Sequence, residues 1–153
     1  MAMSMTGEVK LPADKATVWA KLNDPEVLKA CIPGCQELVK ESDTAFSAVA
    51  KLAIGPVKAT FKGKVTLSDI DAPNGYTISG EGQGGIAGFA KGGAKVHLSD
   101  AEGGGTILSY DVQANVGGKI AQLGSRLIDG VAKKMSDAFF AGFAKAVEAQ
   151  AQA

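Results

Sequence analysis

The feature that most constrains the fold is a long amphipathic segment near the carboxyl end of the chain, from Gly117 to Val147. Its large apolar residues recur at steps of three, four and seven: Ile120, Leu123, Leu127, Ile128, Val131, Met135, Phe139, Phe143 and Val147. This spacing places them on one side of an α-helix, and no proline interrupts the segment. A helix over residues 117–147 would be roughly three times the average length. It therefore needs a large apolar surface to pack against.

The upstream chain predicts such a surface, because most of it alternates between apolar and polar residues as strands do. The expected strands span residues 4–11, 36–40, 44–54, 57–70, 76–82, a stretch after Gly85 that ends at Leu98, and 106–116. Two short helices are expected after the first strand. The first follows Asp14, a residue type that caps helix amino termini, and the second opens at Pro25 and stops before Pro33-Gly34.

This order of elements predicts an α+β fold of the helix-grip (START/Bet v 1-like) type. A curved antiparallel sheet of about seven strands would wrap around the long C-terminal helix and bury one face against it. With 153 residues, the chain is long enough for one domain with a real core, which we expect to span residues 1–153.

The sheet residues expected to face the helix are unusually small: Ala48, Ala50, Ala59, Gly63, Gly80, Gly82, Gly92, Ala94 and Ala114. Either the helix backbone approaches the sheet closely at these positions, or the space between them is a cavity. Strand glycines that let the sheet curl explain only part of this pattern. We therefore favour a hollow apolar pocket, which suits a hydrophobic ligand.

The walls of this pocket are expected to come from both the sheet and the helix. The candidate ligand-binding residues are Phe46, Phe61, Tyr76, Tyr110, Leu123, Leu127, Val131 and Met135. The four helix residues stand opposite the smallest sheet residues. A Gly130→Leu substitution in this part of the helix is then expected to block ligand uptake without unfolding the protein.

Several function classes receive no support from the sequence. Sixteen basic and sixteen acidic residues give a net charge of zero, which argues against nucleic-acid binding. The glycines of residues 80–85 match a dinucleotide-binding pattern, but strand-like alternation follows them instead of a helix. The single histidine, His97, is expected on the outer face of the sheet, and no inward pair of carboxylates is evident. We therefore expect neither a catalytic site nor a metal site, and we interpret Cys31 and Cys35 as packing residues.

The first residues lack an apolar run of the signal-peptide type, and no window reaches the roughly 18 to 20 apolar residues of a membrane span. We expect a cytoplasmic protein, either free or attached peripherally at the inner face of the cell membrane. Ile86 and Phe89, with residues 52–56, would form an exposed apolar rim or else pack on the helix.

Two long segments carry a family resemblance: MTGEVKLPADKATVWAKLNDPEVLKACIPGCQEL at residues 5–38 and GGKIAQLGSRLIDGVAKKMSDAFFAGF at residues 117–143. The pattern L-N-D-P-x-x-L-x-x-C-I-P-G-C at residues 22–35 is the most specific part. These segments resemble the CoxG family, the G subunits of carbon monoxide dehydrogenase, within the START-like helix-grip (SRPBCC) superfamily. The resemblance implies a curved sheet that grips a C-terminal helix over an apolar cavity.

The resemblance also implies a function. Such proteins accompany the molybdenum hydroxylase that oxidises carbon monoxide, help to bring it to the membrane, and bind its electron acceptor, a quinone such as menaquinone or ubiquinone. The chain has no iron–sulfur cysteine set, flavin motif or molybdopterin motif, so the resemblance implies an accessory protein with no covalently bound cofactor. Two alternatives stay open. One is a small cyclase or hydrolase on an apolar substrate, which an inward Tyr76 or Tyr110 with a perturbed pKa and a polar partner would support. The other is an assembly scaffold with a filled core.

Overall fold

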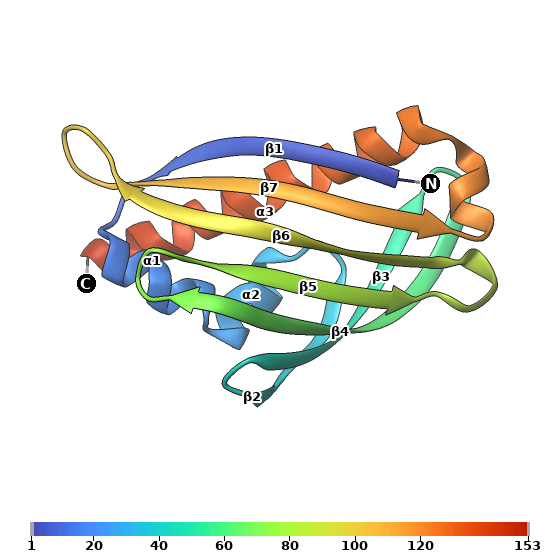
Figure 1. Cartoon of the computed structure of the whole chain (residues 1–153), viewed down its shortest axis with the longest axis horizontal. Helices are drawn as coiled ribbons and strands as arrows, with labels where there is room; N and C mark the ends of the chain where they lie inside the picture. Colours follow the sequence, from blue (N-terminus) through green and yellow to red (C-terminus); the bar gives the residue numbers. More distant parts are fainter. Residues whose placement is uncertain (1, 153) are drawn as a thin grey trace.

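A computed structural model describes residues 2–152, and the side chains of residues 2–148. Residues 1 and 153 of the expected domain lie outside the described residues. Seven antiparallel strands form one curved sheet around a long C-terminal helix (Figure 1). The strands are β1 (Ala2–Leu11), β2 (Cys35–Ser42), β3 (Ala45–Ile54), β4 (Val57–Asp71), β5 (Gly75–Gln83), β6 (Phe89–Asp100) and β7 (Thr106–Gly117). Their order in the sheet is β1-β7-β6-β5-β4-β3-β2.

The helices are α1 (Lys15–Leu22), α2 (Pro25–Cys31) and α3 (Ser125–Gln152), with short 3-10 helices η1 (Gly85–Ala87) and η2 (Lys119–Leu123). The predicted helix-grip fold is therefore confirmed. The strands agree with the predicted ranges to within two residues, except that β6 begins only at Phe89 because η1 occupies the preceding turn. Alternation predicted them well because one face of this sheet is wet and the other is buried.

The long helix begins later than the apolar spacing predicted, so its expected start at Gly117 is wrong. Gly117 ends β7, and η2 stands between this strand and α3. Gly118 and Gly124 adopt positive φ angles of 80° and 94°, which L-residues rarely adopt, and so end the regular structure on each side of η2. The spacing hides this break, because Ile120 of η2 packs in the same core cluster as Ile128 of α3. At its other end α3 passes Val147 and continues to Gln152.

The two short helices are fixed by caps and by bonds to the sheet. Asp14 accepts a hydrogen bond from the backbone N–H of Thr17 at 2.8 Å, which confirms the expected cap of α1. The buried hydroxyl of Thr106, at the start of β7, donates to the carbonyl of Ala13 at 2.7 Å. Lys15 donates to the side-chain oxygen of Asn74 in the β4–β5 turn at 2.9 Å. These bonds hold α1 at one end of the sheet, and α2 then packs against α3 and β2.

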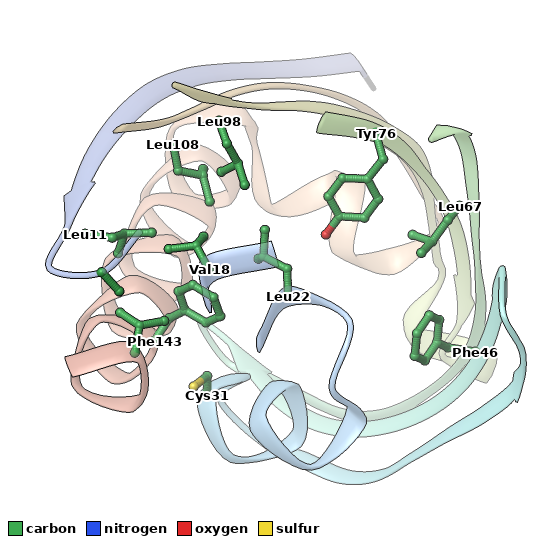
Figure 2. Close-up of a cluster of buried hydrophobic side chains, with 12 residues drawn as sticks. Leu11, Val18, Leu22, Cys31, Phe46, Leu67, Tyr76, Leu98, Leu108 and Phe143 are labelled. Atoms are coloured by element: carbon green, nitrogen blue, oxygen red, sulfur yellow. The ribbon is translucent and has the colours of Figure 1, made fainter. Parts of the chain in front are cut away.

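The buried apolar residues form two clusters along the axis of the molecule. The first cluster lies at the end covered by α1 and α2 and gathers residues from almost every element (Figure 2): Leu11, Ala13, Val18, Leu22, Cys31, Phe46, Leu67, Tyr76, Leu98, Leu108, Phe143 and Val147. The second cluster lies at the other end, beneath η1 and η2: Ile54, Val57, Ala87, Val116, Ile120 and Ile128. The two ends of the interior can therefore be considered separately.

Candidate ligand cavity

An apolar cavity of about 400 Å³ lies beside the first cluster, between the sheet, α2 and α3. Its sheet wall comes from Met5, Leu38, Phe46, Val65, Leu67, Tyr76, Ile78, Ala94, Val96, Leu108, Tyr110 and Val112. Its helical wall comes from Leu22, Leu28, Ile32, Pro33, Met135, Ser136, Phe139 and Phe140. Within this lining, the only polar side-chain groups are three hydroxyls. Such a cavity holds a ligand mainly by removing apolar surface from water.

Aromatic rings form much of the wall. Tyr110 of β7 stacks on Phe140 of α3, with ring centroids 5.3 Å apart. Phe140 meets the edge of Phe139, and Phe139 in turn stacks on the fully buried Phe143 at 5.6 Å. This chain of rings joins the cavity wall to the core. Flat rings packed in this way hold the sheet and α3 apart.

Tyr76 places a hydroxyl group inside this apolar space. Its side chain is only 6% exposed, and Figure 2 shows the hydroxyl pointing into the interior between the sheet and the helices. Burial raises the pKa of Tyr76 to about 12, because the phenolate would be poorly solvated here. The phenol therefore stays protonated at neutral pH. Within residues 2–148, no side chain or backbone group is hydrogen-bonded to this hydroxyl, whereas the ring meets Trp19 edge-on at 5.2 Å.

The other two hydroxyls of the lining form a pair. Tyr110 of β7 and Ser136 of α3 lie 3.2 Å apart, and either one can donate the hydrogen bond. The group that accepts this bond keeps its own O–H for another acceptor. The cavity thus combines apolar walls with hydrogen-bond donors at two places, Tyr76 and the Tyr110–Ser136 pair.

The structure brings together four of the eight residues proposed from the sequence. Phe46, Tyr76, Tyr110 and Met135 all line the cavity. Phe61 instead packs beside the second cluster. The remaining three residues, Leu123, Leu127 and Val131, line an open groove on α3 together with Arg126, Gly130 and Lys134. The cavity therefore lies further along α3 than the sequence indicated.

Gly130 needs a correction for the same reason. It is exposed, and a Cβ atom added there would meet no other atom within 4 Å. The expectation that Gly130→Leu would block the pocket was therefore wrong, because this position does not face the cavity.

Sequence reasoning missed the contributions of α1 and α2 and part of those of α3. Ile78, Val96 and Val112 carried a usable signal, since alternation had already placed them on the inner face. Phe139 belonged to the apolar stripe of the long helix. No comparable signal existed for Leu28 or Ile32, because a seven-residue helix does not reveal which side will dock.

Other features that could carry chemistry lie away from the cavity. His97 is exposed on the outer face of β6, as expected. Residues 80–85 run from β5 into η1, so they do not form a dinucleotide-binding turn. Cys31 and Cys35 are both free, and burial raises the pKa of each thiol, which disfavours the reactive thiolate. Among the described residues, no three acidic, histidine or cysteine side chains gather as a metal site would require. No helix there is both long enough and apolar enough to cross a membrane.

Comparison with known proteins adds a family and several related structures. The model of the CoxG family, described as the G subunit of carbon monoxide dehydrogenase, matches residues 7–148. A conserved protein from Geobacillus kaustophilus shares 32% identity over 95% of both chains, with a TM-score of 0.89. No curated protein sequence matches the chain significantly.

More distant structures share the fold alone. The ZhuI aromatase/cyclase from Streptomyces sp. R1128 has 11% identity and a TM-score of 0.71, over 97% of this chain and 94% of its own. The protein Ara h 8.0201 has 17% identity and a TM-score of 0.67, over 97% of this chain and 99% of its own. These neighbours share the helix-grip architecture of this chain.

Proposed function

The chain belongs to the CoxG family of carbon monoxide dehydrogenase subunits, and on this premise we propose that it is a non-enzymatic accessory protein that binds a quinone in its cavity. Membership of this family suggests an accessory role beside carbon monoxide dehydrogenase, a molybdenum hydroxylase. The proposed protein takes up menaquinone or ubiquinone, the electron acceptor of that enzyme, and helps to recruit the enzyme to the membrane. Binding of a hydrophobic ligand also fits the fold.

The observation that carries this proposal is the hydroxyl of Tyr76, which points into the cavity and has no hydrogen-bond partner within residues 2–148. The oxygen is not among the fully buried polar atoms, so it is open to the cavity and can donate its proton to an acceptor atom on a ligand. A quinone has an apolar ring with carbonyl acceptors on opposite sides. One carbonyl can accept a hydrogen bond from Tyr76, and the Tyr110–Ser136 pair offers a second donor. The aromatic rings of the lining would contact the ring faces.

The cavity size limits how much of the ligand is enclosed. At about 400 Å³ it lies near the low end of small-molecule pockets, which span roughly 300–1,000 Å³. We therefore expect the quinone ring and the first part of its isoprenoid tail to be inside, while the rest of a long tail extends outside. An accessory protein of this kind would carry the reactive ring away from water.

An enzymatic role receives less support from the same groups. The cavity lining contains no histidine, carboxylate, lysine or cysteine, so the usual groups for acid–base or nucleophilic catalysis do not line it. The pKa of Tyr76 is perturbed, but in the direction that makes this phenol a poor base at neutral pH. The scaffold alternative predicted a filled core, whereas this interior contains a cavity.

The quenching of tryptophan fluorescence by a quinone would test the proposal. Trp19, the single tryptophan, lies 5.2 Å from the ring of Tyr76 and so reports on the cavity. Titration with menadione and a short-tailed ubiquinone should quench its emission and raise the melting temperature. Tyr76→Phe should weaken binding by about fivefold, because one hydrogen bond is lost.

A matched control removes a hydroxyl from the same strand without touching the cavity. Ser79 is exposed on the outer face of β5, so Ser79→Ala should bind quinone like the unmodified protein. Absence of both quenching and a thermal shift with either quinone would refute the proposed ligand.

A further inference from the structure

Three turns meet at the end of the molecule that lies furthest from the C-terminus (Figure 1). They are the β3–β4 turn, the η1 turn and the segment that contains η2. We call this end the apolar tip, defined as residues 54–57, 84–89 and 117–127. The second core cluster lies beneath it and supplies a residue from each turn, such as Ile54, Ala87 and Ile120. The tip is therefore a packed part of the fold.

Large apolar side chains project from this tip into solvent. Ile86 in η1 is 93% exposed, Phe89 is 40% exposed, and Leu127 is 36% exposed. The ring of Phe89 lies over Gly117, and Leu127 lies against Gly55 in the β3–β4 turn, so both are held at the surface by packing. Ile86 lies in η1, Phe89 begins β6 and Leu127 lies in the first turn of α3, so the three exposed residues gather at one end of the molecule. Such a group is more informative than three scattered residues.

The charges of the molecule are divided between its two ends. A row of cross-strand partner residues crosses six strands of the sheet at Met3, Ala114, Gly92, Gly80, Val65 and Phe46. Residues 47–64 and 81–91 lie on the tip side of this row. We add residues 115–134, which run from the end of β7 through η2 into α3. These ranges hold nine of the sixteen basic residues and two of the sixteen acidic ones, Glu81 and Asp129. Glu37 of β2, which pairs with Val49, adds a third acidic residue on this side, and Lys133 is ion-paired with Asp137. A chain with zero net charge thus carries an excess of positive charge on its tip side.

Two of these basic residues border the open groove on α3. Its apolar part is formed by Leu123, Leu127 and Val131, and Arg126 and Lys134 supply its positive charge. The groove has a volume of about 480 Å³, and no acidic residue lines it. This combination is complementary to a molecule with an apolar chain and an anionic head.

We propose that the apolar tip is the surface with which this protein contacts an anionic phospholipid bilayer. Ile86, Phe89 and Leu127 enter the interfacial layer, while Arg126 and Lys134 contact lipid phosphates. Lys119 of η2 adds a further exposed positive charge at the tip. This proposal rests on the proposed function in one respect: recruitment of an enzyme to the membrane needs a surface that contacts the membrane. It assigns that surface to the residues named above.

The shape of the tip favours a bilayer over an acidic protein. A stable protein interface buries roughly 800 Å² on each partner, usually as a broad and closely matched surface. The tip instead exposes three separate apolar side chains, one on η1, one at the start of β6 and one at the start of α3, and Arg126 lies next to the last of them. Insertion into a fluid interface requires no matching surface, so this arrangement suits lipid.

Vesicle flotation with the full chain would test the proposal. Vesicles of equal parts phosphatidylglycerol and phosphatidylcholine should bind the protein at about 0.05 M salt, and less at about 0.5 M salt. Pure phosphatidylcholine vesicles should bind it at least tenfold more weakly. Ile86→Asp should reduce binding by at least tenfold, and the double variant Arg126→Glu/Lys134→Glu should do the same.

Matched controls change the same residue types at the opposite end. Ile70, near the end of β4, is 45% exposed, so Ile70→Asp makes the same apolar-to-acidic change away from the tip. Lys29→Glu/Lys145→Glu reverses two exposed charges outside it. Both controls should bind vesicles like the unmodified protein.

Three results would overturn the proposal: no binding to the anionic vesicles, equal binding by Ile86→Asp and Ile70→Asp, or tip variants that lose only binding to the hydroxylase or self-association. The vesicles contain no quinone, so this test is separate from ligand binding. If quinone fails to bind while flotation succeeds, the ligand assignment fails and the contact surface stands. The quinone affinity of Ile86→Asp should be unchanged.

Discussion

The two ends of the interior use side-chain size in opposite ways. Ala90 and Ala94 both lie on the inner face of β6, yet Ala90 packs beside the second cluster and Ala94 lines the cavity. Around Ala94 the walls are tyrosines, phenylalanines and other large residues. Around Ala90, other small residues such as Ala59 and Ala121 accompany the isoleucines of the second cluster. The end that contains the cavity, which we call the hollow end, is therefore lined mainly by large residues. The end that contains the second cluster, which we call the filled end, combines large and small residues.

Whether a cavity forms therefore depends more on the spacing between the sheet and α3 than on the volume of any one residue. Large rings at the hollow end, such as the stacked pair Tyr110 and Phe140, hold the sheet and α3 apart. Small residues at the filled end pack beside the buried isoleucines that come from β3, η2 and α3. A cavity forms where rigid side chains prevent closure.

The largest predicted difference between the two ends is in the cost of truncation. Ile120, only 2% exposed at the filled end, should lose about 2–5 kcal/mol of unfolding free energy on Ile120→Ala, because a new void is created. Met135 borders an existing cavity and is only half-buried, so Met135→Ala should cost about 1 kcal/mol. Urea unfolding at pH 7 measures both. Equal costs would break the comparison.

A second experiment adds a ring at each end. Ala90→Phe should overpack the filled end and reduce the unfolding free energy by about 1–3 kcal/mol. Ala94→Phe should fill the hollow end, weaken quinone binding by about 100-fold and leave stability nearly unchanged. Thermal melting and Trp19 quenching measure the two effects. Gly130→Leu is the control, since its side chain would face open space; an Ala94→Phe protein that still binds quinone normally would place the ligand elsewhere.

The smallest predicted effect is a pH dependence confined to the hollow end. Because burial raises the pKa of Tyr76 from 10.0 to about 12, the folded state holds the phenolic proton more tightly than the unfolded state. The resulting stability of about 3 kcal/mol is fully present below pH 10 and is lost as pH rises through about 12. Urea midpoints between pH 9 and 12 should fall less steeply for Tyr76→Phe than for the unmodified protein. Identical slopes would show that the environment of Tyr76 is not apolar.

The strands of the sheet were predictable because the alternation of apolar and polar residues shows which side of each strand faces solvent. Alternation placed Phe46, Tyr76 and Tyr110 on the inner face, and all three line the cavity. The helix boundaries were less predictable, because the apolar period continues through Gly124, where the helix has not yet begun.

The position of the cavity could not be predicted from residue size. Small inward residues favoured a hollow at Leu123, Leu127 and Val131, but several of these small residues serve strand packing instead. A Cβ atom at Gly63 would collide with the carbonyl of Glu81 on β5, and one at Gly92 would collide with the carbonyl of Gln113 on β7. These glycines permit close approach between neighbouring strands, so here the structural role of strand glycines outweighs the hollow-pocket interpretation.

One wall of the cavity lies outside the strand pairing of the sheet. Leu28, Ile32 and Pro33 belong to α2 and the residues after it, which lie outside the hydrogen-bonded ladder that begins at Cys35. Changes in these three side chains can alter the shape of the cavity while the strand register stays intact. Replacing a few residues of this segment is thus a way to change the ligand preference of the cavity without redesigning the sheet.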